Sequence, residues 1–304
     1  MIRAHAPIAL FVYRRVDHVR RTLEALALNR ESTESDLIMF SDGPQGDTAA
    51  AEVAAVREYL KSVTGFRSID IVERERNLGL AQSIITGVSQ VLSRSDRVIV
   101  MEDDLVTSPH FLRYMNDALS YYQDDDRVAS IHGYVYPVQG PLPETFFLRG
   151  ADCWGWATWR RGWRVFNPNG SDLLAELQRR NLTRHFDFEG TFEYTKMLQN
   201  QIAGTNDSWA VRWYASAFLK EKLTLYPARS LVQNIGNDST GAHCATTDDY
   251  DVSLTSSPVR VGGIPVEDSP VGRNAFVEFG RRNQPRPNLR ATLGRFVRRA
   301  IRSR

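Results

Sequence analysis

Short apolar runs alternate with longer amphipathic segments through the first third of the chain. Four runs are short and apolar on both faces, as expected of buried strands: 7–13, 37–40, 69–72 and 98–101. The segments between them carry apolar residues at helical spacing: 17–28, 47–63 and 77–92. Strands that alternate with helices predict right-handed crossovers and an α/β fold with a mainly parallel central sheet flanked by helices.

Polar residues follow three of these predicted strands directly. Asp42 stands in a turn after the second strand, Asn77 and Gly79 follow the third, and Glu102–Asp104 follow the fourth. Open parallel sheets bind ligands at the carboxyl ends of their strands. We therefore expect these residues to line one binding site.

The acidic triplet, Glu102–Asp104, carries the strongest chemical signal. Carboxylates gathered at the end of a buried strand repel one another and are costly to desolvate unless a positive charge lies beside them. A divalent cation, Mn²⁺ or Mg²⁺, would supply that charge and keep positions open for substrate phosphates. The alternative is a solvated acidic turn. Ser108 and Pro109 then predict the start of a helix, giving the order strand, acidic turn, helix.

The second half has a less regular pattern. Segments 127–134 and 145–150 predict further strands, and antiparallel pairing is open to them. Four of the six tryptophans fall within 153–166, where Trp156, Trp159 and Trp163 lie near helical spacing. We interpret the tryptophans as mainly core, with one or two rings exposed to a sugar substrate.

A polar, glycine-containing loop precedes His243 and Cys244. A lone histidine is usually structural or exposed, but this one follows a loop that could reach the carboxylate site, so it is a candidate metal or diphosphate ligand. The two cysteines make neither a disulfide framework nor a zinc site, and we expect free thiols.

Two enzyme classes are excluded by missing motifs. The chain has no Gly-x-Gly-x-x-Gly after its first strand and no Walker-type phosphate loop. These absences argue against a dinucleotide oxidoreductase and a P-loop NTPase.

Charge is distributed unevenly along the chain. The net charge is +2, but residues 281–304 hold nine arginines and no acid, which leaves 29 basic and 36 acidic side chains before them. Segment 256–288, rich in Ser, Pro, Gly and Arg, predicts an irregular extension, and 289–304 predicts a basic amphipathic tail helix. We expect that helix to bind an anionic membrane surface. Binding to nucleic acid is the competing interpretation; we rank it second and do not expect a nucleic-acid partner.

No apolar run is long enough to span a membrane, and the N-terminal apolar stretch is too short for a signal peptide. We therefore expect a cytoplasmic protein, peripheral on the inner face of the membrane.

Several of these features occur together in a known group of enzymes. They are Arg14 or Arg15 after the first strand, SDGP with Asp42, RNLGLAQS with Asn77 and Gly79, and MEDDLVTSPHFLRYM. The pattern resembles the GT-A nucleotide-sugar glycosyltransferases, especially glycosyltransferase family 2 and the N-acetylglucosaminyltransferase I type. The resemblance implies a GT-A, Rossmann-like domain over 1–255, with a nucleotide-sugar half (1–125) and an acceptor half (126–255).

The resemblance also implies roles for donor-side residues. Asp42 would accept a hydrogen bond from the nucleotide base, Asp103 would lie near the ribose or sugar, and Asp104 would bind Mn²⁺ or Mg²⁺. The other donor-side candidates are Arg14, Asn77, Gly79 and Glu102. The role of Glu102 stays open because the triplet departs from the commoner Asp-x-Asp.

On the acceptor side, Asp207 in NDSW corresponds to the carboxylate base, and Asp152 beside the tryptophans is the alternative. His243 corresponds to a loop that closes over the diphosphate. An inverting reaction needs such a base to take the acceptor's hydroxyl proton.

The expected function is transfer of a hexosyl or N-acetylhexosaminyl group from a nucleotide sugar, with UDP-sugar the first choice, to a glycan or lipid-linked acceptor. The reaction would be metal-dependent and inverting. One alternative is a sugar-nucleotide pyrophosphorylase, although YRRVDH stands where those enzymes carry a Gly-rich loop. The other is a non-catalytic glycan-binding module associated with the membrane.

Overall fold

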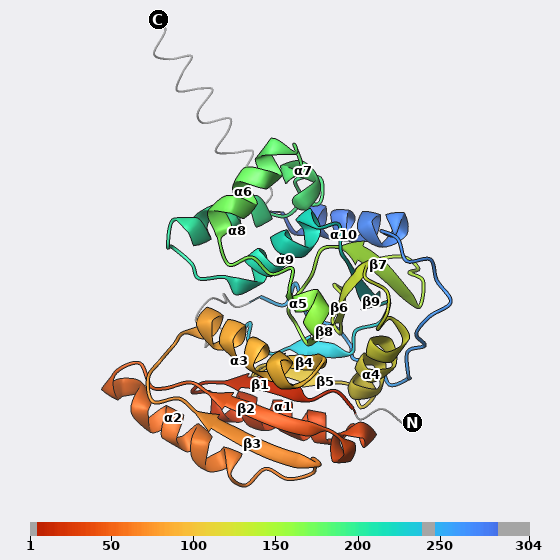
Figure 1. Cartoon of the computed structure of the whole chain (residues 1–304). Coiled ribbons are helices and arrows are strands. Elements are labelled where there is room, and N and C mark those ends of the chain that lie inside the picture. The colour runs from red at the N-terminus through yellow and green to blue at the C-terminus, as the bar shows by residue number, and fades with distance from the viewer. Residues whose placement is uncertain (1–4, 239–246, 285–304) are drawn as a thin grey trace, which may run out of the picture.

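The computed structural model describes residues 5–238 and 247–284, and its centre is an eight-stranded sheet (Figure 1). The strand order is β3-β2-β1-β4-β8-β6-β9-β7. In chain order the strands are β1 (Ile8–Val12), β2 (Asp36–Ser41), β3 (Ser68–Glu73), β4 (Arg97–Glu102), β6 (Val128–His132), β7 (Thr145–Arg149), β8 (Trp156–Trp159) and β9 (Leu223–Pro227). A second, two-stranded sheet pairs β5 (Leu105–Thr107) with β10 (Val232–Asn234).

The sheet is mainly parallel, as predicted. Strands β3, β2, β1 and β4 pair in parallel, whereas β8 runs antiparallel to both of its neighbours, β4 and β6. Strand β9 is parallel to β6, and the edge strand β7 is antiparallel to β9. All strands except β8 and β7 therefore end at the same edge, which we call the carboxyl edge.

Helices cover both faces of the sheet (Figure 1). The helices of the first half are α1 (Val16–Ala27), α2 (Asp47–Leu60), α3 (Leu80–Arg94) and α4 (Phe111–Tyr121), with the 3₁₀ turn η1 (Arg30–Glu34). Those of the second half are α5 (Arg160–Trp163), α6 (Gly170–Arg179), α7 (Thr183–Phe186), α8 (Tyr194–Ile202), α9 (Trp209–Leu219) and α10 (Pro270–Asn283). Alternate residues of β1 face opposite layers: Leu10 packs with α1 and α4, and Phe11 packs with α3.

The region after the acidic triplet differs from the predicted strand, turn and helix. A short strand, β5, follows the triplet at once, and α4 begins at Phe111 instead of Ser108 or Pro109. The Ser108 hydroxyl accepts a hydrogen bond from the His110 amide and donates one to the Thr255 carbonyl. It thus ties the loop to a distant segment and does not cap the helix.

The expected irregular extension over 256–288 is wrong for its second half, because α10 forms there. The Ser269 hydroxyl caps the helix by accepting from the Gly272 amide, and Pro270 occupies the first turn. Phe276 and Phe279 are buried. The helix is therefore part of the packed domain. The tail predicted as a helix over 289–304 lies outside the described residues.

The tryptophans are mainly core, as interpreted, but the helical spacing of Trp156, Trp159 and Trp163 does not reflect one helix. Of these three, Trp156 and Trp159 belong to strand β8 and Trp163 lies in α5. Trp156 stacks on Trp209 with ring centroids 5.5 Å apart. Trp154 alone among the six is only partly buried.

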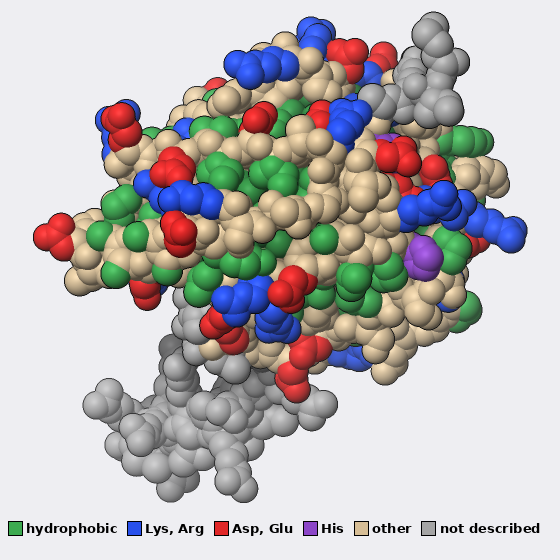
Figure 2. Space-filling model, turned by 90° about the horizontal axis from the view of Figure 1, so that it is seen from below, with side chains coloured by type: hydrophobic (Ala, Val, Ile, Leu, Met, Phe, Trp, Pro, Cys, Tyr) green, Lys and Arg blue, Asp and Glu red, His purple; other side chains and the backbone are tan. Residues whose placement is uncertain are grey.

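The surface seen from below carries mixed charge. On this face, over the part of the chain that the structure describes, basic and acidic side chains are interspersed among apolar ones (Figure 2). None of the described helices is long and apolar enough to cross a membrane.

Candidate functional site

The carboxyl edge brings Arg15 to the acidic triplet, because β1 and β4 are neighbours that end side by side. Arg15 Nη2 donates to Asp103 Oδ1 at 2.5 Å and to Asp104 Oδ2 at 2.6 Å. The Tyr13 amide also donates to Asp103 Oδ2, at 3.3 Å. The three charged side chains are only 18%, 8% and 15% exposed. The positive charge that the triplet requires is thus supplied by the chain itself.

The pKa values follow from this packing. Burial alone would lower the pKa of Arg15, but the charges of Asp103 and Asp104 outweigh it and raise the pKa. Burial, and then the neighbouring Asp104 charge, raise the pKa of Asp103 to about 6. The same causes raise the pKa of Glu102 to about 8. Near pH 7 the triplet therefore carries less than its full negative charge.

Two segments fix the backbone of the triplet: helix α1 and the residues that follow β10. The buried Thr22 hydroxyl donates to the Asp103 carbonyl at 2.8 Å, and the Ile235 amide donates to the Asp104 carbonyl at 2.8 Å. A Cβ atom added to Gly236 would lie 2.2 Å from Asp104 Oδ2. Only glycine lets the chain approach this carboxylate so closely.

The side chains in this arrangement do not fit a divalent cation. Within residues 5–238 and 247–284, no group of three or more His, Cys, Asp or Glu side chains is positioned to hold one. Asp103 and Asp104 share the Arg15 guanidinium instead. The assignment of Mn²⁺ or Mg²⁺ to Asp104 stays a prediction.

The second candidate arginine, Arg14, points elsewhere. It pairs at the surface with Glu52 at 3.5 Å, and both side chains are about half exposed, at 46% and 53%. The structure therefore brings Arg15, and not Arg14, to the triplet.

Asp42, Asn77 and Gly79 come together as predicted. Asp42 Oδ1 accepts from the Gly43 and Leu78 amides at 3.0 Å each, and Oδ2 accepts from the Gly79 amide at 3.1 Å. Asn77 Nδ2 donates to the Gly43 carbonyl at 2.8 Å. The Asp42 carboxylate is only 6% exposed and is committed to backbone groups. It therefore locks the two turns together, and its contact with a nucleotide base stays a prediction.

Asp152 reaches the site through the connection between β7 and β8. This segment returns over β9 and β6: the Thr224 hydroxyl donates to the Gly150 carbonyl, and the Trp154 amide donates to His132 Nε2 at 3.0 Å. Tyr226 Oη donates to Asp152 Oδ2 at 3.3 Å. Because β8 then starts at the carboxyl edge, Asp152 lies near the end of β4.

The imidazole beneath Asp152 is neutral. His132 is fully buried, its Nε2 accepts a hydrogen bond, and this nitrogen lies 3.8 Å from Asp152 Oδ1. Burial lowers the pKa of His132, and the Asp152 charge only partly opposes that effect. The neighbours of the Asp152 carboxylate are therefore the neutral His132 ring, the Tyr226 hydroxyl and the Cys153 amide, which donates to it at 2.8 Å.

The pKa of the Cys153 thiol responds to the charge of Asp152 and to charges of the triplet. Burial raises the pKa of this thiol most, and the nearby charges of Asp152, Glu102 and Asp104 raise it further. Both groups of acids are thus close enough to act on one sulfur atom. Cys153 is a free thiol, as expected, whereas Cys244 lies outside the described residues.

Tyrosines lie near Asp152, and one of them, Tyr226, donates a hydrogen bond to it. Burial is the main cause of the raised pKa of four of them, and the Asp152 charge contributes to each: Tyr134, Tyr136, Tyr194 and Tyr226. We call these four residues the tyrosine wall. Sequence reasoning missed it, because its members come from three separate segments: the stretch after β6, the start of α8, and β9.

Asp207 has different surroundings. It lies just before α9, its side chain is 65% exposed, and it pairs with the nearly buried Arg212 at 3.2 Å. The described contacts do not join it to the triplet. His243, the other candidate from the second half, lies outside the described residues.

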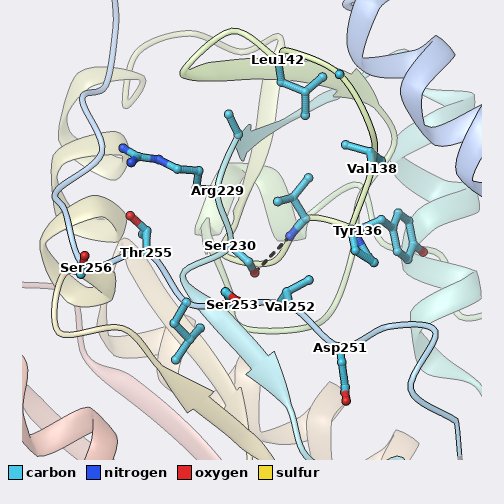
Figure 3. A pocket seen from close by; sticks show the side chains of 15 residues that line it. Tyr136, Val138, Leu142, Arg229, Ser230, Asp251, Val252, Ser253, Thr255 and Ser256 are labelled. Atoms are coloured by element: carbon cyan, nitrogen blue, oxygen red, sulfur yellow. Dashed lines mark hydrogen bonds between the residues drawn. The ribbon is translucent and has the colours of Figure 1, made fainter.

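A cavity of about 600 Å³ lies beside the tyrosine wall (Figure 3). It is lined from three segments, 135–142, 228–230 and 251–256, and includes Tyr136. The Val135 amide donates to the Ser230 hydroxyl at its floor. None of the predicted site residues lines this cavity.

Comparison with protein-family models shows to which family the chain belongs. The family model described as Glycosyl transferase family 2 matches residues 8–171, more than half of the 304 residues. The chain belongs to glycosyl transferase family 2. The match includes Arg15, Asp42, the triplet and Asp152, whereas Asp207 and His243 lie beyond it.

Solved structures resemble this glycosyltransferase only in part. One is the mannosyltransferase PcManGT from Pyrobaculum calidifontis in complex with GDP-Man and Mn²⁺, at 12% identity and a TM-score of 0.30, covering 43% of this chain and 36% of that chain. Another is TarS from S. aureus, at 13% identity and a TM-score of 0.31, covering 48% of this chain and 25% of that chain. The chain thus spans about a third and a quarter of their lengths. No curated protein matches it by sequence.

Proposed function

We propose that this glycosyltransferase moves a sugar from a nucleotide sugar to a glycan or lipid-linked acceptor and inverts the configuration at the anomeric carbon. A UDP-sugar is the first choice of donor. The observation that carries the proposal is Arg15. Its Nη2 is held by two carboxylates, whereas its buried Nη1 has no hydrogen-bond partner among the described residues. A buried charged donor without an acceptor is costly, and a diphosphate oxygen would satisfy it.

Charge at the carboxyl edge suits the departure of a nucleoside diphosphate. The leaving group gains negative charge in the transition state, and a positive group fixed beside it stabilises that charge. Arg15 would supply one such group. A Mn²⁺ or Mg²⁺ ion on Asp104 would supply further charge when bound. Asp42, with the Asn77–Gly79 turn, would shape the nucleotide pocket.

The acceptor side would supply the base. A carboxylate must take the proton of the acceptor hydroxyl for inversion. Asp207 is the candidate that the resemblance implies, while Asp152 is supported by the charges of both Asp152 and the triplet that act on Cys153. The tyrosine wall packs beside Asp152 and holds it in place through the hydrogen bond from Tyr226, while Tyr136 also lines the neighbouring cavity, which is large enough for a sugar acceptor.

A panel of nucleotide sugars tests this function. Thermal unfolding and hydrolysis are measured for each, in EDTA and in Mn²⁺. A donor that binds only the folded state at a hundredfold excess over Kd stabilises it by about 2.7 kcal/mol. Stabilisation with slow sugar release supports a transferase. If added pyrophosphate converts the nucleotide sugar to a nucleoside triphosphate and a sugar 1-phosphate, the protein is a pyrophosphorylase. No effect from any nucleotide sugar indicates a non-catalytic module.

We also propose that the arginine-rich tail holds the enzyme at the inner face of a membrane. The test is removal of residues after Gln284, because α10 ends at Asn283 and the Gln284 side chain still donates to the Gly190 carbonyl. The shortened protein should keep donor hydrolysis and lose sedimentation with anionic vesicles. Vesicle binding that survives the truncation would contradict the membrane role of the tail.

A further inference from the structure

Arg15 occupies one oxygen of each of the two carboxylates that a cation would use. Its Nη2 lies 2.6 Å from Asp104 Oδ2 and 2.5 Å from Asp103 Oδ1. The remaining Asp103 oxygen accepts from the Tyr13 amide. On the other side, Gly236 packs against Asp104 Oδ2 and faces Arg15 Nη1. The pair of carboxylates is therefore enclosed around a guanidinium.

A divalent cation would meet the Arg15 guanidinium in this arrangement. Mn²⁺ or Mg²⁺ binds a carboxylate oxygen at about 2.1 Å, so on Asp103 Oδ1 or Asp104 Oδ2 it would stand against the Arg15 nitrogen. On Asp104 Oδ1 it would still compete with Arg15 for the charge of the same carboxylate. Two unscreened positive charges so close repel strongly in a poorly solvated site. Either Arg15 moves away or the cation binds elsewhere.

We propose that Arg15 and a divalent cation compete for Asp103 and Asp104, so that the free protein holds Mn²⁺ weakly. A nucleoside diphosphate would relieve the competition, because its oxygens offer the Arg15 guanidinium another partner and release Asp104. Donor and cation then bind cooperatively. This second step rests on the proposed function, whereas the competition itself does not.

The competition is tested by Mn²⁺ binding without any nucleotide, followed by the electron paramagnetic resonance signal of free Mn²⁺. Arg15→Met should bind Mn²⁺ about tenfold or more tightly than the wild type, since charge-assisted hydrogen bonds to both carboxylates are lost. The matched control is Arg21→Met, which removes one charge from an exposed position of α1 and should leave the affinity within about twofold. Adding Asp104→Asn to Arg15→Met should abolish the gain.

Equal or weaker Mn²⁺ binding by folded Arg15→Met would overturn the competition, as would an equal gain in Arg21→Met. Circular dichroism establishes that each variant is folded. If Arg15→Met does not fold, Arg15→Lys serves instead, because an ammonium cannot span both carboxylates as the planar fork does. Lysine should give a smaller gain in Mn²⁺ affinity, and no gain would overturn the proposal.

A second titration adds UDP. UDP should tighten Mn²⁺ binding in the wild type by more than in Arg15→Met, where nothing remains to be displaced. Equal tightening in both proteins would overturn the coupling step. If UDP does not bind at all, the proposed donor is wrong, and the nucleotide-free titration still decides the competition.

Discussion

The two groups of acids at the carboxyl edge are stabilised by different means. Asp103 and Asp104 are balanced by a full positive charge, the Arg15 guanidinium. Asp152 has only hydrogen-bond donors, from Tyr226 and the Cys153 amide, beside a neutral histidine. An ion pair can exchange its partners for other ions, whereas a carboxylate among neutral groups can accept a proton, or a hydrogen bond from a hydroxyl group. The first region therefore suits a charged donor and the second a neutral sugar acceptor.

Loss of charge on the donor side should have the largest effect. Asp104→Asn should lower the turnover of sugar transfer by about 10²-fold to 10³-fold, as expected when an electrostatic stabiliser is removed from an active site. The fold should survive, because repulsion within the triplet is also relieved. Asp117→Asn, an exposed change on α4, is the control for both turnover and thermal unfolding. Undiminished turnover in Asp104→Asn would show that this region is not catalytic.

The acceptor side is resolved by comparing Asp152→Asn with Asp207→Asn. The variant that removes the base should lose about 10²-fold in turnover while donor binding stays nearly unchanged. The other should lose much less, since only one carboxylate can take the hydroxyl proton. Single-turnover transfer and calorimetric binding of the donor separate the two. If either variant abolishes donor binding, that residue belongs to the donor site or to the fold.

An intermediate effect is expected at Asp42, whose carboxylate holds three backbone amides. Asp42→Asn replaces one acceptor oxygen by a donor, which opposes those amides, so the Asn77–Gly79 turn should loosen. Donor affinity should fall by about tenfold, the equivalent of one hydrogen bond to a charged group. The measurement is donor KM against kcat. A fall in kcat at unchanged KM would contradict a role in shaping the donor pocket.

The smallest effect concerns stability and pH at His132. Burial lowers the pKa of His132 below its usual 6.5, so the unfolded chain takes up a proton at a higher pH than the folded one. The free energy of unfolding should therefore fall as pH drops through 6.5, by at most about 1.4 kcal/mol per pH unit for one proton.

Urea unfolding of the wild type and His132→Gln at pH 7 and pH 5.5 measures this effect. The variant should lose less stability between the two pH values. His185, whose pKa burial also lowers, is present in both proteins and cancels in the comparison. Equal losses would mean that His132 does not resist protonation.

Much of the donor side was predictable from local pattern. The apolar runs and the helical spacing between them imply parallel strands, and parallel strands carry Asp42, Asn77 and the triplet to one edge whatever the later details. Three clustered carboxylates at a strand end also need a positive charge beside them, which the sequence alone makes clear. The sequence does not identify the residue that supplies this positive charge, because Arg15 and Asp103 are 88 residues apart.

The acceptor side depended on long-range pairing. Strand β8 enters the sheet between β4 and β6 in the opposite direction, and that insertion alone brings Asp152 towards the triplet. The spacing of residues along the chain does not reveal the order of strands in the sheet. The tyrosine wall and the buried His132 could therefore not be predicted. The sequence determined which segments become strands and which strand ends carry charge, since these depend on near neighbours. Tertiary structure decided which charges meet, because that depends on how distant strands pair.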